Sequence, residues 1–269
     1  MAFAPSAMDA PTCCCTGAGR VGACPRGPGA RTLRWGIARI ARPRFPVRSH
    51  AVTRLLLASA SPARRATLAA AGIDALVTVS GVDESAVLAG AAERFGNLEP
   101  ADAVLVLAQA KAQWVVESRA GTSYDDDLLI LGCDSMLELD GEILGKPTDA
   151  ADAVARWQGM RGRSGVLHTG HWLIDDRDPA VGGTGGTLGA TSSTVVHFAD
   201  LTDAEIDAYV ATGEPLGVAG AFTIDGLGGA FVTGIEGDHH GVVGLSLPLL
   251  RELLSDVGVT MDDLWRRDL

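Results

Sequence analysis

The stretch from Leu128 to Pro147, which reads LLILGCDSMLELDGEILGKP, constrains the fold more than any other part of the sequence. It begins with an apolar run, 128–131, that predicts a buried strand, and its Asp140-Gly141 pair predicts a hairpin turn. Asp134 stands just past the apolar run, where a carboxylate is costly unless something pairs with it. Lys146 closes the hairpin and is expected to approach the same region. These two side chains could therefore hold a metal and a phosphate.

Lysine is rare in this chain. Of the 22 lysines and arginines, only Lys111 and Lys146 are lysines. A lysine kept against such a bias suggests a site where a compact ammonium is needed, and chance is the alternative explanation.

Strand and helix patterns alternate along most of the chain. Strands are predicted at residues 54–60, 74–80, 165–176 and 191–200. Helices are predicted at residues 62–71, 100–119, 148–160, 202–211 and 246–257. The glycine-dense segment 213–244 fits a loop-rich wall over a ligand cleft. Together with the hairpin, this alternation predicts an α/β fold with a mixed sheet flanked by helices.

A phosphate-binding corner is predicted where the first strand meets the first helix. Ser61 and Pro62 are typical of an N-cap and a first helical position. The N–H groups of a helix N-terminus, the hydroxyls of Ser59 and Ser61, and Arg64 together suit a phosphate. An ordinary capped surface helix is the alternative.

Four other side chains are expected in ordinary surroundings. Glu84 follows a strand and is placed in a turn, and Lys111, in mid-helix, is expected to point to solvent. Thr148 is expected to cap the helix 148–160. Arg177 begins a glycine-rich loop and is expected to be exposed.

The formal charge of −11 is unevenly distributed. Residues 1–52 contain eight arginines and one aspartate, which leaves a net charge of −18 on the remainder. An acidic body argues against nucleic acid as a partner, because that binding needs a basic face. Only one of the five cysteines lies outside residues 1–52, so a reducing cytoplasm is expected. No apolar run approaches the roughly 18 residues of a membrane span, and no membrane partner is expected.

Residues 1–52 are rich in Arg, Pro, Gly and Ala and have no clear periodicity. They could be a transit peptide, a metal-binding cysteine cluster, or an extension that is disordered or results from a misplaced start codon. The last interpretation is favoured, because a transit peptide should be amphipathic and Cys13, Cys14 and Cys15 are contiguous rather than spaced as ligands. The folded domain is therefore expected over residues 53–269.

Several motifs, in order, resemble the Maf (septum formation inhibitor-like) family of nucleoside triphosphate pyrophosphatases. They include LLLASASPARRATLAAAGI, VDES, LAQAKA, ILGCDSMLELDGEILGKP, YVATGEPLGVAGAFTIDGLGGAFV and GVVGLSLPLL. The resemblance implies a mixed α/β fold of the Maf/ITPase-like kind, with a deep ligand cleft and often a homodimer. It also implies hydrolysis of a nucleoside triphosphate to the monophosphate and pyrophosphate, with Mg²⁺ or Mn²⁺.

The resemblance further implies roles for individual residues. Asp134 matches the family's proton acceptor. Arg64, Lys111 and Lys146 match its cations and would place positive charge on the phosphate oxygens. Glu84 matches its turn carboxylate and, with Asp134, would hold the metal.

Three positions are expected to face the nucleobase or lie beside it. The thymidine/uridine type of the family has an arginine, a threonine and a glutamine where this chain has Ala63, Ser135 and Asp225. An ionised aspartate only accepts hydrogen bonds, which suits the adjacent N–H donors of guanine better than uracil or thymine. A preference for guanine-type or modified purine triphosphates is therefore expected, or else a broad specificity.

Two functions stay open at this point. The first is an enzyme that removes non-canonical or excess nucleotides. The second is a low-turnover, nucleotide-binding regulator of septum formation or cell division. The enzyme is favoured because Asp134, Glu84 and both lysines are present, and a pure binder would be freer to lose its base.

Overall fold

The computed structural model describes residues 53–119 and 127–266 of the chain. The predictions made for residues 1–52 lie outside this part. None of its helices has the length and apolar character needed to span a membrane.

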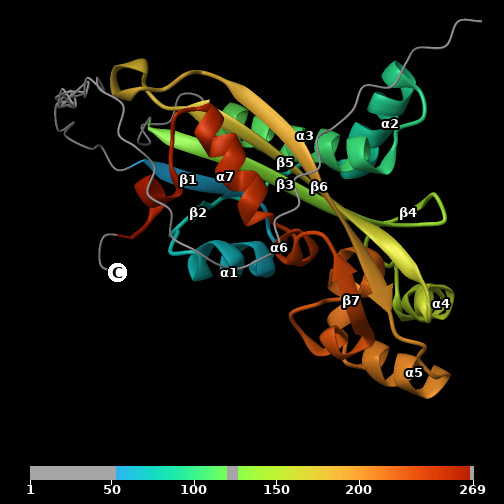
Figure 1. Ribbon diagram of the computed structural model, residues 1–269. Coiled ribbons are helices and arrows are strands. Elements are labelled where there is room, and N and C mark those ends of the chain that lie inside the picture. The colour runs from blue at the N-terminus through green and yellow to red at the C-terminus, as the bar shows by residue number, and fades with distance from the viewer. Residues whose placement is uncertain (1–52, 120–126, 267–269) are drawn as a thin grey trace, which may run out of the picture. The chain divides into compact units, whose positions relative to one another are not determined.

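Within the described residues, seven strands form one mixed sheet (Figure 1). They are β1 (Arg54–Ala58), β2 (Leu76–Val77), β3 (Leu128–Leu139), β4 (Glu142–Leu144), β5 (Ser164–Asp176), β6 (Thr187–Phe198) and β7 (Val232–Glu236). The order is β2-β1-β3-β5-β6-β7, and β4 pairs with β3. The pairs β2–β1 and β1–β3 are parallel and the others antiparallel. The predicted α/β class with a mixed sheet is confirmed.

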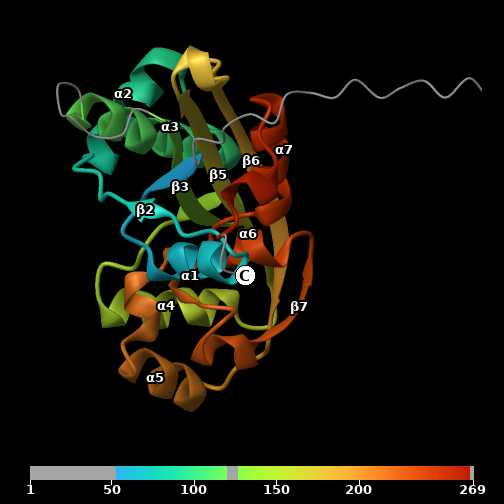
Figure 2. The same ribbon diagram turned by 90° about the vertical axis from the view of Figure 1, so that its left-hand side faces the viewer.

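Helices cover both faces of this sheet. They are α1 (Pro62–Ala70), α2 (Glu84–Phe95), α3 (Pro100–Arg119), α4 (Ala150–Met160), α5 (Asp203–Ala211), α6 (His239–Val243) and α7 (Leu247–Asp256). Figures 1 and 2 show α3 and α7 on opposite faces. Alternate residues of a strand point to opposite faces, so Leu129 belongs to the same apolar cluster as Leu250 of α7, whereas Ile130 belongs to another cluster with Val115 of α3.

A separate apolar cluster holds α4 and α5 against the far ends of β3, β5 and β6. Its centre is Trp157, which is fully buried. The ring of Trp157 makes edge-to-face contacts with Phe198 and Tyr209. Its indole N–H donates to the carbonyl of Ala221 at 2.8 Å, which ties this cluster to the irregular segment after α5.

Local signals predict several elements well. Helix α3 has the bounds that its sequence pattern predicts. Ser61, Thr202 and Ser246 are the N-caps of α1, α5 and α7, and Thr202 forms the predicted capping box with Glu205. The positive φ angles of Asp140 and Gly141 form the predicted tight turn between β3 and β4.

Other local predictions are wrong. The N-cap of α4 is Asp149 rather than Thr148, because the Asp149 carboxylate accepts from the N–H of Asp152. The strand predicted at 74–80 is only two residues long, since β1 pairs with it only at two positions. The strand predicted at 191–200 begins at Thr187 and ends at Phe198.

Arg177 is buried rather than exposed. Its guanidinium donates to both carboxylate oxygens of Asp175, at 2.6 and 2.9 Å, and to the carbonyl of Val257 at 3.0 Å. This interaction satisfies the charge of Asp175, which is itself buried. Arg177 therefore joins the end of β5 to the residue that follows α7.

Candidate active site

Asp134 lies in the middle of β3. Its place just after the apolar run had suggested the end of a strand, and that prediction is wrong. The strand continues because β5 pairs with it through Glu138, and Asp134 stands opposite Gly170 in this register. Its side chain points to the face that α3 covers and is about one-tenth exposed. A buried carboxylate in mid-strand needs a cation beside it.

Two glycines allow α3 to supply that cation. A Cβ at Gly132 would lie 2.0 Å from the carbonyl oxygen of Ala108, and one at Gly170 would lie 2.5 Å from that of Val104. The backbone of α3 therefore rests directly on β3 and β5. Lys111 is one helical turn beyond Ala108, so the close contact brings its side chain onto the sheet beside Asp134.

Lys111 bridges two carboxylates. Its Nζ lies 2.5 Å from Oδ1 of Asp134 and 2.7 Å from Oε1 of Glu84. The expectation that Lys111 points to solvent is wrong, because α3 packs on the sheet and leaves this side chain 11 % exposed. Glu84 is not in a turn: it is the first residue of α2, whose N-cap is Asp83. An acid in the first turn of a helix is favourable for the helix dipole.

The surroundings of Asp134 make it a stronger base than an ordinary aspartate. Burial raises the pKa of this carboxyl, while the positive charges of Lys111 and Arg64 act in the opposite direction. A carboxylate whose pKa is raised accepts a proton more readily. By contrast, burial raises the pKa of the neighbouring Cys133 thiol to about 12, so that group stays protonated.

Arg64 holds the opposite side of the site. Its guanidinium donates to the Oγ atoms of Ser59 and Ser135 at 3.0 and 2.9 Å, and to the carbonyls of Cys133 and Gly244 at 2.8 and 2.7 Å. Arginine carries five N–H donors, so one is left for a ligand once these four acceptors are served. Arg64 is thus a rigid connection between α1, β3 and the end of α6.

Ser135 and Thr169 extend this connection in one direction. The hydroxyl of Thr169 donates to the carbonyl of Gly241 at 2.8 Å, so Thr169 accepts the hydrogen of Ser135, 2.9 Å away. Ser135 in turn accepts from Arg64. This series of hydrogen bonds therefore ends at a backbone carbonyl of α6. The hydrogen of the Ser135 hydroxyl is already donated to Thr169.

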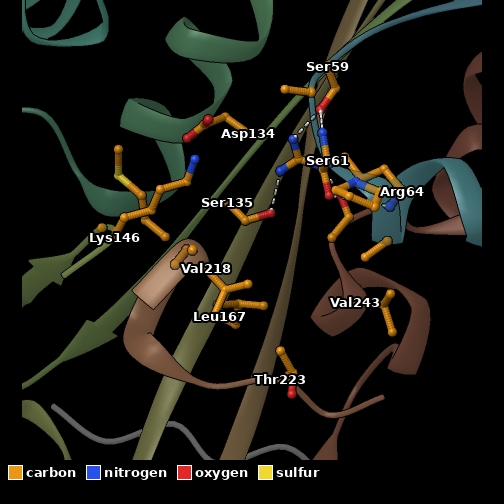
Figure 3. Close-up of a pocket in the computed structure, with 18 of the residues that line it drawn as sticks. Ser59, Ser61, Arg64, Asp134, Ser135, Lys146, Leu167, Val218, Thr223 and Val243 are labelled. Carbon is orange, nitrogen blue, oxygen red and sulfur yellow. Dashed lines mark hydrogen bonds between the residues drawn. The ribbon is translucent and has the colours of Figure 1, made fainter. Parts of the chain in front are cut away.

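The predicted site residues surround one cleft of about 410 Å³ (Figure 3). All ten line it: Ser59, Ser61, Ala63, Arg64, Glu84, Lys111, Asp134, Ser135, Lys146 and Asp225. The cleft lies beyond the carboxyl ends of β1 and β2, where ligands bind in α/β sheets. Figure 3 shows Asp134 and Lys146 on one side and Ser59, Ser61 and Arg64 on the other. Lys146 and Asp225 are exposed at its rim.

The cleft also has an apolar part, most of which belongs to the segment 213–244 that was predicted to form a wall over a ligand cleft. It is lined by Leu167, Val218, Phe222, Ile224, Val242 and Val243. A cleft of this size with one charged end and one apolar end suits a ligand that has both anionic groups and an aromatic ring.

Glu214 is a residue whose role the sequence patterns missed. Its carboxylate accepts from the hydroxyls of Thr223 and Tyr209, at 2.5 and 3.0 Å, and from the N–H groups of Leu227 and Gly228, both at 3.0 Å. Burial acts to raise the pKa of Glu214, but these hydrogen bonds lower it to about 2. The segment 223–228, which includes Asp225, is therefore organised around one ionised side chain. The only sign of this role of Glu214 in the sequence is that a charged residue stands inside a glycine-dense stretch.

Glu84 and Asp134 are the residues that could hold a metal. The described residues contain no cluster of three or more metal-ligating side chains. Magnesium, however, is commonly bound by one or two carboxylates with substrate phosphates and water as the other ligands. The two carboxylates converge on one point, now marked by the ammonium of Lys111, and each contact uses only one of their oxygens. This donor set fits a hard divalent ion that binds together with a phosphate ligand.

Known proteins resemble this chain over most of its length. A relative in Salinispora tropica is 57% identical over 80% of this chain and 88% of its own, one in Streptomyces coelicolor is 52% identical over 79% and 94%, and one in Mycobacterium marinum is 48% identical over 80% and 97%. Each is named nucleoside triphosphate pyrophosphatase. The profile of the Maf-like protein family matches residues 54–257, which include the ten predicted site residues. The chain therefore belongs to the Maf family.

Proposed function

We propose that this protein hydrolyses a nucleoside triphosphate to the nucleoside monophosphate and pyrophosphate. Three relatives are named for pyrophosphatase activity on such nucleotides. The observation that carries the proposal is the buried Lys111 between Asp134 and Glu84, in a cleft that also contains Arg64 and Lys146. Phosphoryl transfer depends on this combination of a base with several fixed cations.

Asp134 is the proposed proton acceptor. The attacking water gives a proton to its carboxylate while the water oxygen forms a bond to the α-phosphorus. The bond from that phosphorus to the bridging oxygen breaks, and pyrophosphate leaves with this oxygen and its electron pair. Lys111, Lys146 and the remaining N–H of Arg64 would balance the charge on the phosphate oxygens.

Glu84 and Asp134 are the proposed ligands of a divalent metal, Mg²⁺ or Mn²⁺. When bound, such an ion neutralises charge on the phosphate oxygens. The support for this assignment is the convergence of the two carboxylates at the charged end of the cleft.

The apolar end of the cleft is the proposed position of the nucleobase. Ala63 lies in the first turn of α1, Ser135 in β3 and Asp225 in the segment that Glu214 organises. Asp225 would accept hydrogen bonds from a guanine-type base. Ser135 would contribute mainly shape, since its hydroxyl is already committed to Thr169.

A direct assay tests the proposed reaction. Purified protein would be incubated with a panel of nucleoside triphosphates and Mg²⁺ or Mn²⁺, and pyrophosphate release would be measured with a coupled pyrophosphatase. Release of one pyrophosphate and one monophosphate per triphosphate supports the enzyme. Tight nucleotide binding without turnover would support the regulator of septum formation or division instead.

Three broader expectations accompany the proposal. Residues 53–269 should suffice for activity, so a protein that lacks residues 1–51 should match the full chain in turnover and melting temperature. The protein should act in the cytoplasm, which cell fractionation would test. It should form a homodimer, which light scattering coupled to gel filtration would test.

A further inference from the structure

The space between the two proposed metal ligands is filled by a side chain of the protein itself. Nζ of Lys111 lies 2.7 Å from Glu84 and 2.5 Å from Asp134, so both carboxylates bind the same ammonium. A point shared by two carboxylate oxygens is also where a divalent ion would bind. Metal and ammonium therefore cannot both use these two oxygens.

We propose that Lys111 is the resident counter-cation of this carboxylate pair and that it makes metal binding depend on the nucleotide. Without nucleotide, the ammonium occupies the pair and metal binds weakly. A bound triphosphate draws the ammonium onto its phosphate oxygens and so frees the carboxylates for the metal. This inference rests on the proposed function, because it assigns the pair to a metal and the cleft to a triphosphate.

Burial makes the competition strong. The side chains of Lys111 and Asp134 are 11 % and 10 % exposed, so water screens their charges little. A divalent ion that entered beside the ammonium would meet an unscreened positive charge at close range. The same burial makes an unpaired Asp134 costly, so some cation has to be present at all times.

Lys111 is the cation of the cleft best suited to such an exchange. Arg64 is held by four acceptors that no ligand would replace, since two of them are backbone carbonyls and two are hydroxyls. Lys111 has the two carboxylates as its partners, and a metal can take over both. Glu84 is 53 % exposed at the start of α2 and can adjust to the shorter bonds of a metal.

Metal binding without nucleotide tests the proposal directly. Mn²⁺ affinity would be measured by electron paramagnetic resonance and calorimetry for the wild type and for Lys111→Met, which removes the charge but keeps much of the side chain. We expect the variant to bind Mn²⁺ at least about tenfold more tightly, since a unit charge in contact with the site is lost. Lys111→Arg keeps the charge and should bind Mn²⁺ as weakly as the wild type.

Lys146→Met is the matched control. It removes the other lysine of the same cleft, and this exposed side chain is not part of the carboxylate pair. Its Mn²⁺ affinity without nucleotide should stay within about twofold of the wild type. Equal Mn²⁺ affinity of wild type and folded Lys111→Met, or an equal gain in Lys146→Met, would overturn the proposal.

A second measurement uses the wild type alone. The chain has only two lysines, so protein labelled with ¹⁵N-lysine has only two side-chain ammonium signals. Mg²⁺ alone should leave the Lys111 signal in place, whereas Mg²⁺ with an α,β-methylene nucleoside triphosphate should shift it. A shift with Mg²⁺ alone at submillimolar concentration would contradict the proposal. None of these readouts needs turnover, so a failed exchange stays distinguishable from a failed enzyme assignment.

Discussion

The two sides of the cleft are built by different means. On the sheet side, Asp134 and Lys111 belong to a central strand and a helix of 20 residues, and both are buried. On the wall side, the segment 214–231 consists largely of short 3₁₀ helices. Helix α5 joins this segment through Tyr209, which donates to Glu214.

The difference indicates how the two sides should respond to mutation. Packing of strands and a long helix fixes the groups assigned to the chemistry, so losing one such group should remove its chemical contribution and leave the others in place. The wall depends on the hydrogen bonds of one carboxylate, so its loss should move several lining residues together. We expect the first kind of change to lower kcat and the second to raise KM and to alter base preference.

Asp134→Asn should give the largest effect. Loss of the proton acceptor should lower kcat by about 10² to 10⁴. The fold should persist, because burial already disfavours the charged form of this side chain. Steady-state kinetics and thermal unfolding would be measured together. Near-normal turnover by a folded variant would contradict the assignment of Asp134.

Lys111→Ala should follow, with a loss of roughly 10² in kcat/KM, comparable to the loss of one donor that stabilises a transition state. Lys146→Ala should lose less, because this lysine is exposed at the rim. Arg251→Ala, an exposed arginine of α7, serves as the control and should be neutral. Arg177 is unsuitable as that control because it is buried against Asp175. Equal losses in all three variants would contradict the difference between the two lysines.

The sheet and the wall should also lose stability in different pH ranges. Burial and the charge of Arg64 lower the pKa of His171, beneath the N-cap of α7, from 6.5 to about 4. Between these values the unfolded chain binds a proton that the folded chain does not, so stability falls by roughly 3 kcal/mol as pH falls through this window. Glu214 has a lowered pKa of about 2, so its contribution is present above pH 4.5 and is lost as pH falls towards 2.

Urea unfolding at a series of pH values would check this prediction. His171→Gln should flatten the profile between about pH 6.5 and 4, since glutamine can still donate and accept but does not titrate. His239→Gln removes an exposed histidine and should keep the wild-type profile. A profile that is unchanged in His171→Gln would show that this histidine is not the cause.

Glu214→Gln should have a smaller effect on activity. An amide offers one acceptor oxygen in place of two, so some of the four donors around it lose their partner. We expect KM to rise several-fold with little change in kcat. Glu205→Gln, in the capping box of α5, is the control: it should change thermal stability but not KM. A large loss of kcat in Glu214→Gln would show that the wall also positions the chemistry.

Asp225→Gln should give the smallest effect. It should shift relative kcat/KM towards UTP and dTTP by a few-fold, because glutamine can both donate and accept. The effect is limited because Asp225 is exposed at the rim, where water competes for its hydrogen bonds. The measurement is kcat/KM for GTP, 7-methyl-GTP, dTTP, UTP and CTP. A wild type that already prefers UTP and dTTP would contradict the role of Asp225.

The sequence predicts best what depends on neighbouring residues. The caps at Ser61 and Thr202 are local, and so is the turn at Asp140-Gly141; all three were predicted. The ten residues that the motifs proposed for the site all line one cleft. The burial of Lys111 could not be predicted in this way, because it results from contact between elements far apart in the chain.

The wall was also predicted only in part, because its organisation depends on contacts between distant segments. Its glycines predicted irregular backbone, but not which side chain would organise it. Glu214 has this role because α5 and the segment 223–228 meet around it, and that meeting depends on the apolar cluster at Trp157. Helix α2 was missed for a simpler reason, since Asp83 and Glu84 look like solvated acids unless Asp83 is recognised as an N-cap.

The close seating of α3 on Gly132 and Gly170 makes the spacing of charges in the site depend on two missing methyl groups. A single added carbon at either glycine would lift the helix, because its backbone already occupies that space. The lysine would then withdraw from its acidic partners, although neither substitution touches a charged residue. Mutational scans should therefore find sensitive positions beneath the helix as well as around the ligand. Inherited or engineered changes at these two glycines would alter the distance between Lys111 and its two carboxylates without changing any residue that lines the cleft.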